Sequence, residues 1–317
     1  MRVLSCLVLL PACAGDLLVG GGHTVDGTAS VFATLQDADS PVSLAPGVAI
    51  EVETAGPGTA WAPASGVVTA TDVSPLDVVL AADNSGSVDW DTLSVRGALR
   101  DFAAGLLADD PRTRAGLVRI STEAELLLPP TADAAALDAA LGELFVSNGW
   151  TALWDGLRIA NEALDAAAVP ASDQGCGARP QPTVVAVVDG VDNNSDDRHA
   201  TDTYAGDGVD TDLESLLALR AGDTYTTVHV VELGPVPQEA PLRRLASATG
   251  GAHLEAVERE ALATSLAEIR AVLSARAAVC FVPARCDDTR VRMVARWREG
   301  GRAHTATATA RIPSSCG

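Results

Sequence analysis

Five oxygen-bearing side chains stand at the ends of apolar runs or at the start of a helical pattern. They are Asp83, Ser85, Ser87, Thr151 and Asp189. Two carboxylates and three hydroxyls make an all-oxygen shell, which suits a hard divalent cation such as Mg²⁺, Mn²⁺ or Ca²⁺ and does not suit zinc or copper. Five such ligands leave an octahedral ion with one position for water or an outside ligand. The sequence therefore predicts a divalent-metal site with an open position.

Predicted elements of an α/β fold would bring these residues together. Residues 76–82 form an apolar run that ends at Asp83, and residues 183–188 form another that ends at Asp189. Thr151 begins a helical pattern that extends to residue 167. In open α/β sheets, ligands bind in the crevice outside the carboxyl ends of the strands. An alternative is that Ser87 or Asp89 only caps the next helix, but this leaves Thr151 and Asp189 without a role.

Apolar strands alternate with helices from residue 75 to residue 275, which is the pattern of a parallel sheet covered on both faces. This alternation predicts one doubly wound α/β domain of about 200 residues. The predicted strands are 76–82, 115–121, 124–128, 183–188, 226–233 and 253–256, and the predicted helices are 90–107, 134–145, 151–167, 213–220, 240–249 and 259–275.

Both flanking segments have a hydrophobic period of two, which is typical of strands. Residues 30–35 and 48–52 alternate before the α/β region. Residues 290–298 place Val291, Met293, Ala295 and Trp297 on one face and arginines on the other, and residues 305–312 form the returning strand. We expect segments 13–74 and 276–317 to pair into one β-domain, because neither alone offers two apolar faces to pack. We expect the arginine face to be solvated, with docking of an acidic partner or lipid headgroup as the alternative.

The metal-site residues resemble the metal-ion-dependent adhesion site (MIDAS) of the von Willebrand factor type A (vWA) domain, which has a Rossmann-like doubly wound fold. The DxSxS motif is complete in Asp83, Ser85 and Ser87, the family's threonine falls on Thr151, and its distal aspartate falls on Asp189. The resemblance covers residues 75–275 and implies that the metal, Mg²⁺ by preference, binds an Asp or Glu of a protein partner. Two residues depart from the family pattern: Trp150 replaces a glycine and Val188 replaces a serine or threonine. Trp150 could crowd the metal or form an apolar wall for the ligand.

The N-terminus resembles an export signal. We predict that residues 1–12 are a signal peptide, because residues 3–12 are almost wholly apolar and too few to span a bilayer. The sequence Leu10-Pro11-Ala12-Cys13 resembles a bacterial lipobox, which implies lipidation of Cys13 and an envelope location, with the membrane contacted only through this anchor. Ordinary secretory cleavage is the alternative.

Of the six cysteines, Cys6 belongs to the predicted leader and Cys13 to the lipobox, which leaves four. An even number in an oxidising compartment favours disulfides over a zinc site. The helix 259–275 should end at the sheet edge where strand 183–188 begins, which favours a bond between Cys176 and Cys280. Cys286 and Cys316 then flank the C-terminal hairpin and can close it.

The charge of the chain bears on two kinds of ligand, nucleic acid and calcium. The net charge of −20 opposes nucleic-acid binding. Between Asp192 and Glu214 we predict a solvated acidic loop, with calcium binding as the alternative. Its acids are Asp192, Asp196, Asp197, Asp202, Asp207, Asp210, Asp212 and Glu214.

The hypothesis that the protein is an enzyme has little support in the sequence. A serine hydrolase requires a histidine base, and no histidine is predicted at a strand end facing Ser85 or Ser87. His229 is predicted to be a core residue. A phosphatase would need a second metal and a basic clamp. We therefore expect a binding protein, or alternatively a structural or assembly subunit of an envelope complex that does not use the metal.

Overall fold

The computed structural model describes residues 16–25, 28–37, 40–42, 44, 48–70, 75–86, 92–144, 149–168, 179–189, 192–197, 208–234, 239–257, 259–299 and 302–314. Four sites predicted from the sequence lie outside these ranges: Cys13, Ser87, Cys176 and Cys316. Within the described residues, no helix is both long and apolar enough to cross a membrane.

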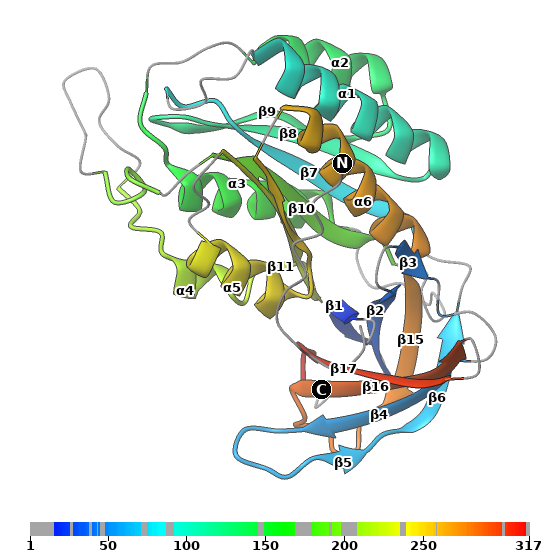
Figure 1. The fold of residues 1–317 in the computed structure, drawn as a ribbon. Coiled ribbons are helices and arrows are strands. Elements are labelled where there is room, and N and C mark those ends of the chain that lie inside the picture. Colours follow the sequence, from blue (N-terminus) through cyan, green and yellow to red (C-terminus); the bar gives the residue numbers. More distant parts are fainter. Residues whose placement is uncertain are drawn as a thin grey trace.

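A six-stranded sheet forms the centre of the α/β region, in the order β14-β13-β10-β7-β8-β9 (Figure 1). Five strands are parallel, and the edge strand β9 runs antiparallel to β8. The fold class predicted from the sequence is confirmed. β9 reverses because only the short segment 121–123 joins it to β8, whereas a parallel neighbour needs a long crossover. The strands are β7 (Leu76–Asp83), β8 (Arg114–Ile120), β9 (Ala124–Thr131), β10 (Gln181–Val188), β13 (Thr227–Leu233) and β14 (His253–Ala256).

Helices cover both faces of this sheet. α1, α2 and α6 bury leucines such as Leu99, Leu141 and Leu266 against one face, and α3, α4 and α5 bury Leu157, Leu216 and others against the opposite face. The predicted helix at 213–220 is only a single turn. The bounds are α1 (Thr92–Asp109), α2 (Ala134–Gly142), α3 (Leu153–Ala167), α4 (Leu213–Leu216), α5 (Glu239–Thr249) and α6 (Arg259–Ala275), and a small hairpin of β11 (Arg220–Ala221) and β12 (Thr224–Tyr225) follows α4.

The strands from the two ends of the chain pair with each other in two further sheets. In one, β15 lies between β2 and β6, with β1 and β3 on the far side of β2; in the other, β16 lies between β4 and β17, with β5 beyond β4. The predicted pairing of N- and C-terminal strands is confirmed, although β15 was not foreseen as a strand. The bounds are β1 (Asp16–Val25), β2 (Thr28–Asp37), β3 (Ser40–Val42), β4 (Ala49–Ala55), β5 (Ala62–Pro63), β6 (Ser65–Ala70), β15 (Ala277–Val282), β16 (Arg290–Glu299) and β17 (Arg302–Arg311).

The two β-sheets share one apolar core. Val291, Met293 and Ala295 are fully buried on the face of β16 that the alternation predicts, against Val31 of β2 and Phe281 of β15. The β-region also contacts the α/β region. Thr34 donates a hydrogen bond of 3.1 Å to the carbonyl of Val272 in α6. Gly250 has a φ of +78°, and a Cβ there would lie 2.0 Å from the Val19 carbonyl oxygen, so only glycine allows β1 to approach this closely.

The arginine face of β16 is largely exposed, and its arginines also contact neighbouring side chains. Arg292 donates to Glu53 of β4 at 2.7 Å, and Arg296 forms an ion pair with Glu51 of the same strand. Arg290 and Arg292 also lie over the ring of Trp61, at 5.3 and 4.9 Å from its centroid. The expected exposure of this face is confirmed, and antiparallel pairing with β4 adds ion pairs to it: Glu53 lies directly opposite Arg292, and Glu51, opposite Val294, lies diagonal to Arg296.

Cys280, buried in β15, and Cys286, in the turn that follows it, are both disulfide-bonded. The proposed partners Cys176 and Cys316 lie outside the described residues, so the pairing stays a prediction. One contact bears on it: the Ser314 hydroxyl donates to the Cys286 carbonyl at 3.0 Å. This brings the chain close to Cys286 two residues before Cys316.

Candidate metal centre

Asp83 is the last residue of β7, at the carboxyl edge of the central sheet. β7 lies between β10 and β8. The register pairs Asp83 with Ile120 of β8, and its neighbour Ala82 with Val187 of β10. The Asp83 carboxylate accepts hydrogen bonds from the backbone amides of Ser85 (2.8 Å) and Asp189 (3.3 Å). The sequence interpretation placed Asp83 on an open crevice, but only 4% of the residue is exposed.

The carboxyl groups of Asp83 and Asp189 form a pair. Burial raises the pKa of Asp83, and hydrogen bonds with the backbone and side chain of both Ser85 and Asp189 partly offset this rise. Two carboxyl groups this close cannot both be ionised cheaply in a buried setting unless a cation lies beside them. A divalent cation beside the two groups would remove this cost.

Thr151 is brought to the same edge by backbone contacts. The amide of Gly86, in the loop after β7, donates to the Gly149 carbonyl at 3.1 Å, and the Thr151 amide donates to the Asn193 side chain at 2.7 Å. Thr151 is 3% exposed and Ser85 is also 3% exposed. The structure thus joins the loops of Asp83, Ser85, Thr151 and Asp189, whereas Ser87 lies outside the described residues.

The donor set fits a hard cation. Within the ranges that the structure describes, no three His, Cys, Asp or Glu side chains cluster, so hydroxyls must complete any shell around Asp83 and Asp189. Neutral hydroxyls and two carboxylates are the ligands that Mg²⁺, Mn²⁺ and Ca²⁺ prefer.

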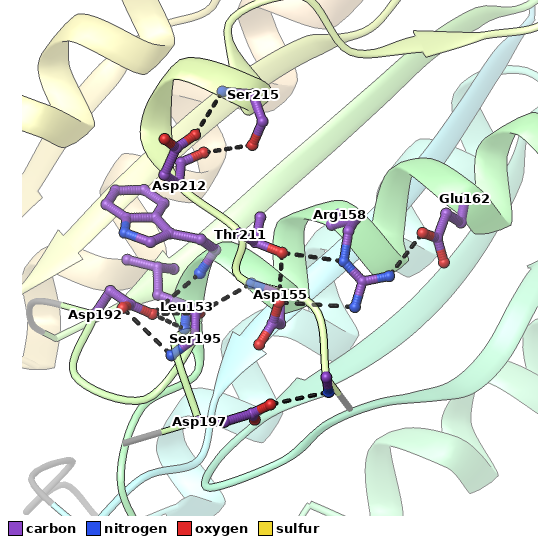
Figure 2. A network of polar contacts seen from close by, with 12 residues as sticks. Leu153, Asp155, Arg158, Glu162, Asp192, Ser195, Asp197, Thr211, Asp212 and Ser215 are labelled. Atoms are coloured by element: carbon purple, nitrogen blue, oxygen red, sulfur yellow. Dashed lines mark hydrogen bonds and ion pairs between the residues drawn. The ribbon is translucent and has the colours of Figure 1, made fainter. Parts of the chain in front are cut away.

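The first turn of α3 is capped by side chains from a different segment (Figure 2). Ala152 precedes the helix and has no side chain able to cap it. Asp192 accepts instead from the amides of Leu153 (2.8 Å) and Trp154 (3.3 Å), and Ser195 accepts from the amide of Asp155 (3.1 Å). Burial raises the pKa of Asp192, against the lowering effect of these hydrogen bonds.

The prediction of a solvated acidic loop does not include this capping role of Asp192. The available signal was the run Asp192-Asn193-Asn194-Ser195, which contains only residues that commonly cap helices. Since a cap normally comes from the residue just before its helix, nothing in the sequence pointed to α3.

A second contact ties the far end of the acidic loop to the same helix. Asp155 is buried, and its carboxylate accepts a hydrogen bond of 2.6 Å from the Thr211 hydroxyl. Arg158 donates to Thr211 at 3.1 Å and lies 3.7 Å from Asp155. The two ends of the acidic loop therefore attach to consecutive turns of α3.

The family comparison supports this geometry. Residues 78–191 match the family model described as the von Willebrand factor type A domain. The chain contains a vWA domain. The match runs from the middle of β7 to just beyond Asp189, and the sheet order and two-sided helix cover described above extend the vWA-type fold beyond it.

Solved structures with similar folds are distant in sequence. A von Willebrand factor type A structure from Catenulispora acidiphila is 14% identical, with 96% of this chain and 75% of that chain covered and a TM-score of 0.45. The ArnB paralog VWA2 from Sulfolobus acidocaldarius is 11% identical, with coverages of 95% and 76% and a TM-score of 0.41. Proximal thread matrix protein 1 from the mussel byssus, with a zinc-occupied MIDAS motif, is 18% identical, with coverages of 65% and 50% and a TM-score of 0.46. A comparison with curated protein sequences gives no match.

The described acids at both ends of the acidic loop form local contacts, while Asp196, Asp210, Asp212 and Glu214 are exposed, as a solvated loop predicts. Asp197 accepts from the Gly208 amide at 2.9 Å, and Asp212 caps α4 by accepting from the Ser215 amide at 2.8 Å. Glu214 forms an ion pair of 2.5 Å with Arg244 of α5. Asp202 and Asp207 lie outside the described residues.

Trp150 directly precedes Thr151 of the candidate site, and 49% of the residue is exposed. Its backbone amide donates to the Thr122 hydroxyl at 3.0 Å, and the flanking residues Gly149 and Thr151 are held by the contacts given above. The backbone is thus fixed while a large apolar surface faces solvent. An exposed indole beside a ligand site is typical of a binding surface.

Proposed function

We propose that the vWA domain binds a divalent cation at Asp83, Ser85, Ser87, Thr151 and Asp189 and uses it to hold an Asp or Glu side chain of a protein partner. vWA domains often bind a divalent metal at this motif and often mediate protein interactions. The observation that supports the proposal is the contact of the buried Asp83 carboxyl with Asp189, with Ser85 beside it. Such a pair is costly without a cation and favourable with one.

The carboxylates and the hydroxyls would contribute differently to metal binding. Asp83 and Asp189 supply the negative charge, and the hydroxyls of Ser85, Ser87 and Thr151 are neutral ligands. The bound ion would supply a local positive charge that attracts another carboxylate even though the chain carries a net charge of −20. Mg²⁺ is our first choice, with Mn²⁺ and Ca²⁺ as alternatives. Because zinc occupies the MIDAS motif of the mussel protein, Zn²⁺ should be tested together with these three ions.

The proposed work is binding rather than catalysis. His229 is buried in β13, where its Nδ1 accepts from the Ala252 amide at 3.0 Å. His253 pairs with Glu232 at 2.9 Å. Both rings are thus engaged in contacts within the sheet. We propose further that Cys13 carries lipid and anchors the exported protein to a membrane of the cell envelope.

The experiment measures which envelope proteins are captured in three conditions: by the immobilised wild type in Mn²⁺, by the wild type in chelator, and by the Asp83→Asn variant in Mn²⁺. We expect bound proteins, identified by mass spectrometry, to be lost both in chelator and with Asp83→Asn. Asn keeps the size of the side chain and removes its charge. The alternative function, an envelope assembly subunit that does not use metal, predicts the same captured proteins in all three conditions.

A further inference from the structure

Residues Asp192, Asn193, Asn194 and Ser195, here called the capping clamp, surround the backbone at the start of α3. The amides of Leu153, Trp154 and Asp155 have no partner within their own helix, because the first turn of any α-helix leaves such groups unpaired. The clamp satisfies all three through Asp192 and Ser195. The Ser195 hydroxyl also donates to Asp192, which holds the two capping side chains together.

The capping clamp also forms hydrogen bonds with Thr151 directly. The Asn193 side chain accepts from the Thr151 amide at 2.7 Å. The amides of Asn193 and Asn194 donate to the Thr151 carbonyl at 3.0 and 3.2 Å. Both backbone polar groups of Thr151 are therefore bound by the clamp, and the position of Thr151 depends on it.

The clamp also lies between two predicted metal ligands. Asp189 precedes Asp192 by three residues, and Thr151 lies on the other side of the contacts. The Asn194 side chain adds a hydrogen bond of 2.8 Å to the Thr122 carbonyl, next to the residue whose carbonyl holds the Ala152 amide. The clamp is thus braced against a third loop.

We propose that the capping clamp sets the position of Thr151 relative to Asp189, so that metal affinity depends on Asp192, Asn193 and Ser195 although none of them is a ligand. These are positioning residues, and the inference rests on the proposed metal function. Partners that orient metal ligands change metal affinity about 10- to 100-fold when removed.

The test measures Mn²⁺ affinity by isothermal titration calorimetry, at a temperature where every variant is folded. We expect Asp192→Ala to weaken Mn²⁺ binding about 10-fold or more. Asp192→Asn should recover most of the affinity, since an amide oxygen can still accept from the Leu153 and Trp154 amides. Ser195→Ala removes one acceptor and should give a smaller loss, and it serves as the second variant if Asp192→Ala does not fold.

Asp133→Ala is the matched control. Asp133 caps α2 by accepting from two consecutive amides, those of Ala135 (2.9 Å) and Ala136 (3.2 Å), just as Asp192 does for α3. Both alanine variants should lower the melting temperature, but only Asp192→Ala should weaken Mn²⁺ binding. If folded Asp192→Ala and Ser195→Ala bind Mn²⁺ as wild type does, the clamp proposal is wrong and the metal function stands. If wild type itself binds no divalent metal, both proposals fall.

Discussion

At the scale of single residues, the positions of the site could be predicted from the sequence, and their surroundings could not. Asp83 and Asp189 directly follow apolar runs, so a parallel sheet must bring both to its carboxyl edge. The burial of Asp83 and the capping role of Asp192 depend on how loops distant in sequence fold over that edge. No local pattern records such contacts, which join residues about 40 positions apart.

Trp150 gives the first prediction. Trp150→Ala should leave Mn²⁺ affinity unchanged and weaken partner capture about 10-fold, because a half-exposed indole at the centre of an interface commonly contributes more than 1 kcal/mol to binding. Titration calorimetry with Mn²⁺ and with a captured partner measures the two effects. Stronger Mn²⁺ binding by the variant would instead favour the alternative that Trp150 crowds the metal.

At the scale of elements, hydrophobic period identified the strands and helices of the vWA domain, because each buries a stripe or face of regular spacing. It could not predict pairing between strands far apart in the chain. The arginines of β16 are exposed as expected, but their ion pairs with Glu51 and Glu53 follow from the register with β4, which periodicity does not give. The short β15 was missed because it follows α6 almost without a break.

His229 in the buried strand β13 gives a prediction about pH. Burial lowers its pKa to about 4, against about 6.5 for an exposed histidine. Between these values the unfolded chain takes up a proton that the folded chain does not. The stability contribution is therefore complete above pH 6.5 and falls as the pH drops, by about 2 kcal/mol at pH 5.

His229→Asn removes this titration and offers the Ala252 amide another acceptor. Urea unfolding at pH 7.5 and pH 5 should show a pH dependence smaller by about 2 kcal/mol in the variant than in wild type. The comparison at pH 7.5 accounts for the lost packing volume. Equal pH dependence in both proteins would mean that the ring is accessible to protons in the folded state.

At the scale of the whole molecule, strands from both ends of the chain close a β-region against the vWA domain. We predict disulfides Cys176–Cys280 and Cys286–Cys316, the second closing a loop of about 30 residues and stabilising the protein by roughly 3 to 4 kcal/mol. Non-reducing peptide mapping should find both, and reduction should lower stability while Mn²⁺ binding persists in protein that remains folded. A linked Cys280–Cys286 peptide would refute this pairing.

The central claim is that Asp83 and Asp189 form a metal centre, and the melting temperature with and without Mn²⁺ tests it most directly. In chelator, Asp83→Asn should melt at or above the wild-type temperature, because one buried carboxyl of the pair is gone. Added Mn²⁺ at 100 times its dissociation constant should stabilise wild type by about 2.7 kcal/mol and leave Asp83→Asn unchanged. An equal response of both proteins to Mn²⁺, or none in either across Mg²⁺, Mn²⁺, Ca²⁺ and Zn²⁺, would contradict the account.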